Sequence, residues 1–157
     1  MDVSLLEKVA LFEGLTHAQL RKVAALTGTQ RFEGGDQIFK DGDRGADMYV
    51  ITEGKVRISK TVPGIGEEAL AILEKGAYFG EMAIVDAGPE PTTRSADAIA
   101  HGGCEVMVIE REKLEALMFT DKDLAYVLLW NLVRTLSSRL RETNEKIKGF
   151  FAISRFG

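Results

Sequence analysis

A segment in the middle of the chain combines residues that can bind an anion. Gly80 precedes a short helical stretch, expected over 81–85, whose first backbone amides would have no partner within the helix. Arg94 follows at the start of an expected strand, between Thr93 and Ser95. A guanidinium and neighbouring hydroxyl groups can bind a phosphate through charge-assisted hydrogen bonds. This pattern suggests a phosphate site. The alternative is that Glu81 and Arg94 form an ion pair at the surface.

The residues around this segment are expected to form a small antiparallel barrel. Short runs rich in β-branched and aromatic residues alternate with glycine turns from residue 29 to about residue 110. Turns about every 8–12 residues are typical of an antiparallel barrel or jelly roll rather than of a parallel sheet. The expected strands are Gln37–Phe39, Asp47–Thr52, Lys55–Thr61, Glu68–Leu73, Arg94–Ala100 and Cys104–Ile109.

Helices are expected on both sides of the barrel. Thr16 and Gln19 form a capping-box pattern that starts a helix, which should end at Gly28. A short helix over 111–119 and a long one to about Gly149 should follow the barrel. The predicted class is α+β: an antiparallel β jelly-roll barrel with N-terminal helices and a long C-terminal dimerisation helix. We expect a single domain, divided into N-terminal helices 1–28, barrel 29–110, C-terminal helices 111–150 and a short tail 151–157.

The long helix carries a heptad seam, in which apolar residues recur at alternating steps of three and four. Its members are Tyr126, Leu129, Val133, Leu136, Leu140, Thr143, Ile147 and Phe150. Such a seam is typical of a helix that pairs with another helix. Because the helix is longer than a barrel of this size can cover, we expect a homodimer. The alternative is that this face packs on the barrel.

Composition excludes several classes of function. The 157 residues are 45% hydrophobic and 28% charged, with a net charge of −4. This balance indicates a globular protein without general attraction to nucleic acid or to an anionic membrane. One cysteine, Cys104, and two histidines make a disulfide framework or a multi-histidine metal site improbable. The first 14 residues lack the pattern of a secretory signal, so we expect a cytoplasmic protein with no resident metal or cofactor.

The middle segment resembles a known motif. Phe79-Gly80-Glu81-Met82-Ala83, followed by Arg94-Ser95-Ala96, is similar to the phosphate-binding cassette of the cyclic nucleotide-binding domain family. The spaced glycines and strands of residues 34–56 resemble the barrel of that family. The long helix resembles its C-helix, and residues 138–146 in particular resemble the dimer helix of the catabolite activators. The resemblance covers nearly the whole chain.

This resemblance implies roles for individual residues. Glu81 would accept a hydrogen bond from the ribose 2′-hydroxyl, and Gly80 would allow the sugar to approach closely. Arg94 would pair with the exocyclic oxygens of the cyclic phosphate. The Ala83 amide and the Ser95 hydroxyl would assist it. The implied ligand-binding residues are Phe79, Gly80, Glu81, Met82, Ala83, Arg94, Ser95, Thr143 and Asn144, the last two against adenine.

Two features depart from the family pattern. Glu81 and Arg94 are separated by more residues than is usual, which lengthens the loop over 86–93. Pro89 and Pro91 would stiffen this loop, and Glu90 could weaken phosphate binding. The chain also shows no segment that resembles the helix-turn-helix of the catabolite activators, so we expect no direct DNA binding.

Together these observations predict a stand-alone cyclic nucleotide sensor without enzymatic activity. Cyclic AMP is the preferred ligand, and cyclic GMP is an alternative because Ser95 could bind guanine. Three phenylalanines near the C-terminus would contact a protein effector or fold back on the chain: Phe150, Phe151 and Phe156. One rival is an interaction protein of the same fold that has lost ligand binding. Another is a cupin-type enzyme, which the positions of His17 and His101 do not support.

Overall fold

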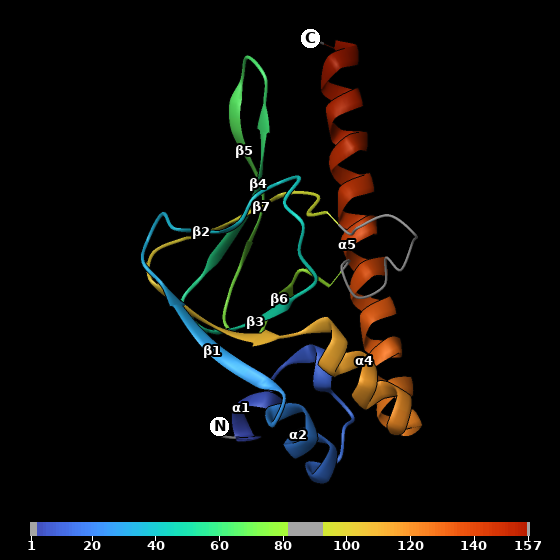
Figure 1. The fold of residues 1–157 in the computed structure, drawn as a ribbon. Helices are drawn as coiled ribbons and strands as arrows, with labels where there is room; N and C mark the ends of the chain where they lie inside the picture. Colours follow the sequence, from blue (N-terminus) through green and yellow to red (C-terminus); the bar gives the residue numbers. More distant parts are fainter. Residues whose placement is uncertain (1–2, 82–92, 157) are drawn as a thin grey trace.

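Two four-stranded antiparallel sheets form the centre of the molecule (Figure 1). The computed structural model describes residues 3–81 and 93–156, apart from the side chains of the last two. One sheet has the order β1 (Thr27–Phe32), β8 (Cys104–Ile109), β3 (Met48–Glu53) and β6 (Tyr78–Phe79). The other has the order β2 (Gln37–Phe39), β7 (Asp97–Ala100), β4 (Val56–Val62) and β5 (Gly66–Leu73). This arrangement confirms the predicted class of antiparallel strands with flanking helices.

The helices gather at one end of the sheets and along one side (Figure 1). At the end lie α1 (Val3–Glu7), the 3-10 helix η1 (Ala10–Phe12), α2 (His17–Ala24) and α4 (Arg111–Thr120). The expected capping box is present, because Gln19 N–H donates to Thr16 Oγ1 and Thr16 N–H donates to Gln19 Oε1. The last helix, α5 (Lys122–Phe156), runs along the side of both sheets.

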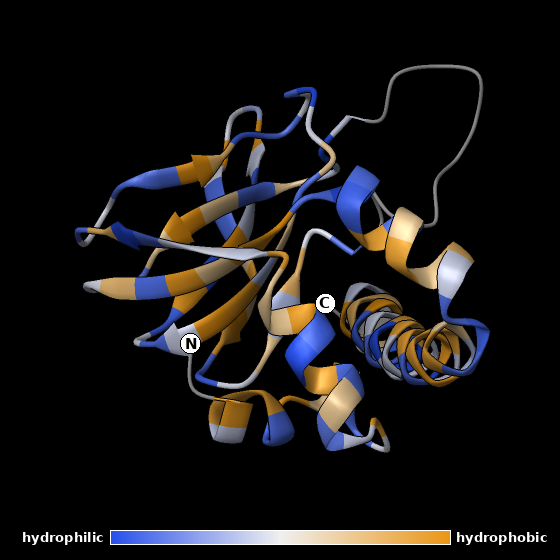
Figure 2. Cartoon of the chain, turned by 60° about the horizontal axis from the view of Figure 1, so that its bottom comes forward, coloured by the Kyte–Doolittle hydropathy of each residue, from blue (hydrophilic) through white to orange (hydrophobic). Residues whose placement is uncertain are grey.

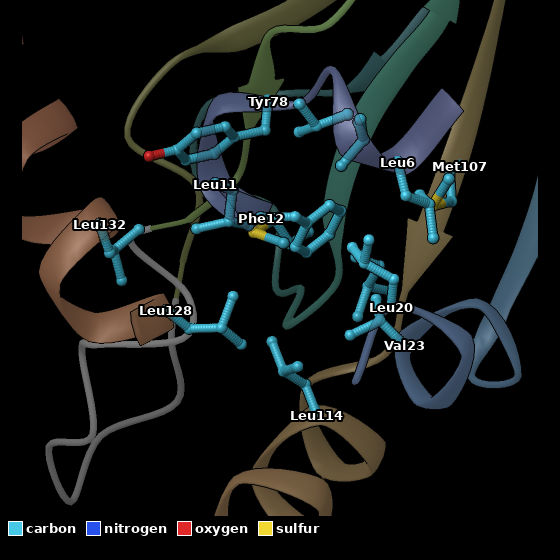
Figure 3. Packing of buried hydrophobic residues seen from close by; sticks show 14 of the residues in the cluster. Leu6, Leu11, Phe12, Leu20, Val23, Tyr78, Met107, Leu114, Leu128 and Leu132 are labelled. Carbon is cyan, nitrogen blue, oxygen red and sulfur yellow. The ribbon is translucent and has the colours of Figure 1, made fainter. Parts of the chain in front are cut away.

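Buried apolar residues form two clusters. The first joins the helices to the sheet that contains β3 and β8, and includes Leu11, Phe12, Tyr78, Leu128 and Leu132 (Figure 3). The second lies between the two sheets and is made of Tyr49, Ile51, Val56, Phe79, Ala98, Ala100, Cys104 and Val106. The first cluster fixes the lower half of α5, and the second supports the strands that carry the site.

The two faces of α5 differ. Leu124, Leu128 and Leu132 are buried against the first cluster, and Leu136 is half-buried beside them. Six members of the predicted heptad seam are exposed large side chains: Tyr126, Leu129, Val133, Leu140, Ile147 and Phe150. Figure 2, which looks along α5, shows hydrophobic residues on more than one side of this helix. The alternative, in which the whole seam packs on the barrel, therefore does not hold for these six residues.

Three expected boundaries were wrong. The helix that starts after Thr16 ends at Ala24, because the chain then enters β1, a mostly polar strand that the sequence pattern did not reveal. The strand expected from Arg94 begins at Asp97. The tail expected over 151–157 continues α5 to Phe156, since Gly149 only weakens a helix and no proline follows it.

Candidate functional site

Arg94 is a buried arginine at the edge of the two-sheet core. Its backbone is fixed by two hydrogen bonds, from Arg94 N–H to Asp43 O and from Gly42 N–H to Arg94 O, each 2.8 Å. The side chain is only 6% exposed, and Nη2 donates to the carbonyl oxygen of Asp47 at 2.9 Å. Among the described residues, Nε and Nη1 have no hydrogen-bond partner. A buried guanidinium with unpaired donors is uncommon, because such groups are costly unless something binds them.

Two glycines make room for this guanidinium. Gly80 has φ +79°, and a Cβ atom there would lie 3.0 Å from Arg94 Nη1 and 2.9 Å from Asp47 O. A Cβ atom on Gly45 would lie 2.8 Å from Nε and from Nη2 of Arg94. Any larger residue at Gly80 would be strained and would also press on the guanidinium. The two glycines therefore allow the Arg94 guanidinium to lie directly against the backbone of Gly45 and Gly80.

Aromatic rings form one wall of the arginine site. The guanidinium carbon of Arg94 lies 4.4 Å from the ring centroid of Phe39 and 5.7 Å from that of Tyr49. Phe79, which the sequence suggested as a ligand contact, is buried and stacks on Tyr49 with centroids 5.1 Å apart. The rings of Phe39 and Tyr49 stabilise the cation, and Phe79 supports the Tyr49 ring from behind. These rings therefore fix the position of the Arg94 guanidinium.

The electrostatics of the site favour a bound anion. Burial lowers the pKa of Arg94 from its usual value, and the nearby Tyr49, Asp47 and Asp43 only partly oppose this. Burial likewise raises the pKa of the Tyr49 hydroxyl. Arginine nevertheless stays protonated at neutral pH. An anion at Nε and Nη1 would restore both the charge balance and the missing hydrogen bonds of the cation.

Glu81 is buried beside α5. Its carboxylate is 5% exposed and pairs with Nη1 of Arg139, while Arg139 Nη2 donates to the Tyr78 carbonyl oxygen at 2.6 Å. The Arg139 guanidinium also lies over the Tyr78 ring, 5.3 Å from its centroid. Figure 3 shows the Tyr78 hydroxyl pointing towards α5. The residues just before the cassette and the cassette glutamate are thus joined to the long helix.

The other expected site residues are more dispersed. Ser95 follows Arg94 directly and is exposed. Thr143 is exposed on α5 and donates to the carbonyl of Arg139 at 3.0 Å, whereas Asn144 lies on the helix face of Leu140 and Ile147. Only Thr143 shares the helix face of Arg139. Met82, Ala83, the rest of the expected 81–85 helix and the loop residues 86–92 lie outside the described residues.

Sequence reasoning did not find Arg139. A usable signal was present. Leu136 follows Leu132 by four residues and Arg139 follows Leu136 by three, so Arg139 continues the buried face of α5. A charged residue that continues an apolar face usually has a buried partner. Which partner it would have depended on the path of the chain, since Glu81 is 58 residues away in sequence.

Comparison with known proteins agrees with this geometry. Residues 29–121 match the cyclic nucleotide-binding domain family. The chain is 34% identical over 134 residues to the cyclic AMP receptor protein of Thermus thermophilus, covering 85% of this chain and 58% of that protein. It is 32% identical over 118 residues to the cGMP-dependent protein kinase egl-4 of Caenorhabditis briggsae, covering 74% of this chain and 15% of the kinase.

A solved structure has the same architecture. A cyclic nucleotide-binding domain from Methylobacillus flagellatus superposes with a TM-score of 0.79 at 26% identity, covering 92% of this chain and 79% of that one. The two antiparallel sheets and the long C-terminal helix define the class of this chain as a cyclic nucleotide-binding domain fold. The chain belongs to the cyclic nucleotide-binding domain family. It spans less than two thirds of each curated relative named above.

Proposed function

We propose that this protein is a regulatory protein that binds cyclic AMP. The observation that carries the proposal is Arg94, a buried guanidinium whose Nε and Nη1 have no partner among the described residues. A cyclic phosphate carries one negative charge and two exocyclic oxygens, which suit two N–H donors on one guanidinium. Gly80 and Gly45 carry no side chain that would compete with such an anion for the guanidinium.

Glu81 would bind the ribose 2′-hydroxyl and transmit binding to α5. The carboxylate that would accept this hydroxyl already pairs with Arg139 of the helix. A ribose hydroxyl at Glu81 must therefore share or replace that contact. Because a ligand shifts an equilibrium only between states that it contacts differently, α5 becomes the element whose position depends on the ligand.

Cyclic AMP is preferred over cyclic GMP because of the polar residues on α5. Thr143 lies on the α5 face of Arg139, where an adenine amino group could reach its hydroxyl. Asn144, one residue further, would take part from the adjoining face. A named relative is a cyclic AMP receptor protein, but another is a cGMP-dependent kinase. Since Ser95 stands beside Arg94 and could bind guanine, cyclic GMP is the second ligand to test.

The exposed seam of α5 would form a homodimer. Six large apolar side chains on one face of a 35-residue helix are what a paired helix requires. Phe150 and Phe151 are exposed near its end and would extend the seam or contact a protein effector, together with Phe156. Ligand binding at Glu81 would then alter how the two helices pair.

The proposed role is regulatory and cytoplasmic rather than catalytic, with the nucleotide as ligand and no resident cofactor. The kinase relative is matched over only 15% of its length, and the net charge of −4 does not favour nucleic acid. Within residues 3–81 and 93–156, no helix is both long and apolar enough to cross a membrane.

Calorimetric titration with cyclic AMP and with cyclic GMP tests the proposal. The wild type, Arg94→Met and the control Arg31→Met are compared, the last being an exposed arginine that pairs with Glu105. We expect saturable binding near one nucleotide per chain in the wild type and the control, and none in Arg94→Met. Absence of heat with both nucleotides in the wild type would contradict the proposal.

A second candidate is an interaction protein that keeps the fold without binding nucleotide. It is favoured by the pairing of Glu81 with Arg139, which occupies the carboxylate in the present structure, and by the exposed face of α5. An intact dimer in sedimentation analysis, with no heat from either nucleotide, would select this function.

A further inference from the structure

Strand β5 contains a bulge that faces the long helix. In its pairing with β4, Ile58 opposes Ala71 and Ser59 opposes Ala69, so no residue of β4 is paired with Leu70. β5 is the last strand of its sheet, and the hairpin that it forms with β4 stands beside the upper half of α5 (Figure 1). The carbonyl oxygen of Leu70 accepts a hydrogen bond from Lys146 Nζ of α5 at 2.8 Å. Bulges re-aim the groups of a strand, and this one supplies a carbonyl to the helix.

The same face of α5 makes two contacts with the sheets, two helical turns apart. Arg139 holds Glu81 and the Tyr78 carbonyl, and Lys146 holds the Leu70 carbonyl seven residues later. Seven residues of α-helix rise about 10.5 Å. Thr143 lies on that face between the two contacts. A nucleotide that reaches from Arg94 to Thr143 would therefore lie beside the stretch of α5 between Arg139 and Lys146.

We propose that Lys146 and the Leu70 bulge form a clasp that holds the β4–β5 hairpin against α5 and sets the rate at which nucleotide leaves. The inference rests on the proposed function, in which Lys146 would be a positioning residue that does not contact the nucleotide. The clasp is a single bond from an exposed lysine to a bulge carbonyl on a strand whose side chains are almost all exposed. Such a contact opens far more readily than the part-buried Arg139–Glu81 pair, whose carboxylate is shielded from solvent.

Opening of the clasp would free the hairpin and leave the rest of the site in place. Lys146 contacts neither Arg94 nor Glu81 through any described bond, so the phosphate and ribose contacts do not depend on it. The base end of the ligand would lose its cover while the phosphate end kept its cation. A weakened clasp should therefore speed nucleotide release more than it changes nucleotide entry or the stability of the fold.

Dissociation kinetics test the clasp directly. A fluorescent cyclic AMP analogue is displaced by excess unlabelled cyclic AMP from the wild type, Lys146→Met, Lys146→Arg and Lys148→Met. The last is the matched control, a lysine of the same helix placed about 160° around the helix axis from Lys146. Loss of one surface bond to a charged group should raise the release rate of Lys146→Met about fivefold. Lys146→Arg keeps a donor and should stay near wild type, and Lys148→Met should equal wild type.

Hydrogen exchange provides a readout that a merely structural role would not give. In Lys146→Met, amides of residues 62–72 should exchange faster than in Lys148→Met, while the melting temperatures of both variants match the wild type. Equal release rates in Lys146→Met and Lys148→Met would overturn the clasp, provided that the wild type binds nucleotide. A wild type that binds no nucleotide would instead contradict the proposed function. The proposal that the clasp sets the rate of nucleotide release would then fail with it.

Discussion

Two polar side chains are buried to nearly the same extent but are used differently. Asn131 of α5 is 7% exposed and Arg94 is 6% exposed. Asn131 Nδ2 donates to the carbonyl oxygens of Leu11 and Glu13, both at 2.8 Å, and so fastens the long helix to the N-terminal segment. Arg94 has one such bond and two unpaired donors among the described residues. Equal burial with unequal pairing separates a structural residue from the one that we propose binds a ligand.

The largest expected effect is on nucleotide binding by Arg94→Met. We expect affinity for cyclic AMP to fall about a thousandfold, because a charge-assisted phosphate contact is lost. The melting temperature of the ligand-free variant should not decrease, since a desolvated cation with unpaired donors is replaced by an apolar side chain. Calorimetry and thermal denaturation measure both. A large loss of ligand-free stability would mean that Arg94 is a structural residue like Asn131.

The reverse pattern is expected for Asn131→Ala. The carbonyl groups of the buried Leu11 and of Glu13 would lose their donor, which should lower the free energy of unfolding by about 2–3 kcal/mol. Affinity for cyclic AMP should change less than twofold, because Asn131 bonds to the N-terminal segment and not to Arg94 or Glu81. Urea denaturation gives the first quantity and calorimetry the second. Preserved stability together with weakened binding would contradict the comparison.

Glu81 is an intermediate case, buried but paired with a single half-exposed partner. A double-mutant cycle of Glu81→Gln and Arg139→Met in the ligand-free protein should give a coupling energy of about 1–2 kcal/mol. Arg141→Met, on an exposed turn of the same helix, is the control and should cost almost nothing. A coupling near zero would indicate that Arg139 does not hold α5 to the cassette.

The smallest effect concerns the start of α5. Asp121 accepts hydrogen bonds from Leu124 N–H and from Lys22 Nζ, both 3.1 Å, and the first of these chiefly lowers its pKa. The resulting stabilisation is present above the usual pKa of aspartate and is lost as the pH falls through the lowered value. Melting curves from pH 7 to pH 3 should show a loss in the wild type that Asp121→Asn lacks.

The matched control for that loss is Glu110→Gln. Glu110 precedes α4 without capping it through its side chain. Its replacement should leave the pH dependence of the melting temperature unchanged. If Asp121→Asn keeps the wild-type pH dependence of the melting temperature, the loss does not come from protonation of Asp121.

The sequence predicted those features that depend on local chemistry. The capping box at Thr16 and the strands Gln37–Phe39 and Cys104–Ile109 follow from nearby side chains, and all three are confirmed. The order of glycine, glutamate and arginine in the cassette was likewise readable, since it is a contiguous pattern. Strand β1 was missed because its pairing with β8 is made by backbone groups and most of its side chains are exposed.

Features that depend on chain path were not predictable. Arg139 and Lys146 meet partners 58 and 76 residues away, and no spacing rule connects them. The aromatic wall of Arg94 joins Phe39 and Tyr49 from different sheets, which no local pattern reveals. The heptad seam predicted an exposed apolar face correctly, whereas a homodimer remains a prediction.

The anchoring of α5 makes this helix a lever. Asn131 and the leucines around it act as a pivot near one end, and the helix continues for 25 more residues to Phe156. That arm is about 37 Å long at 1.5 Å per residue. A tilt of about 5° at the pivot would displace the far end by roughly 3 Å. Under the proposed function, a small rearrangement at Glu81 would thereby be magnified at the exposed Phe150 and Phe151.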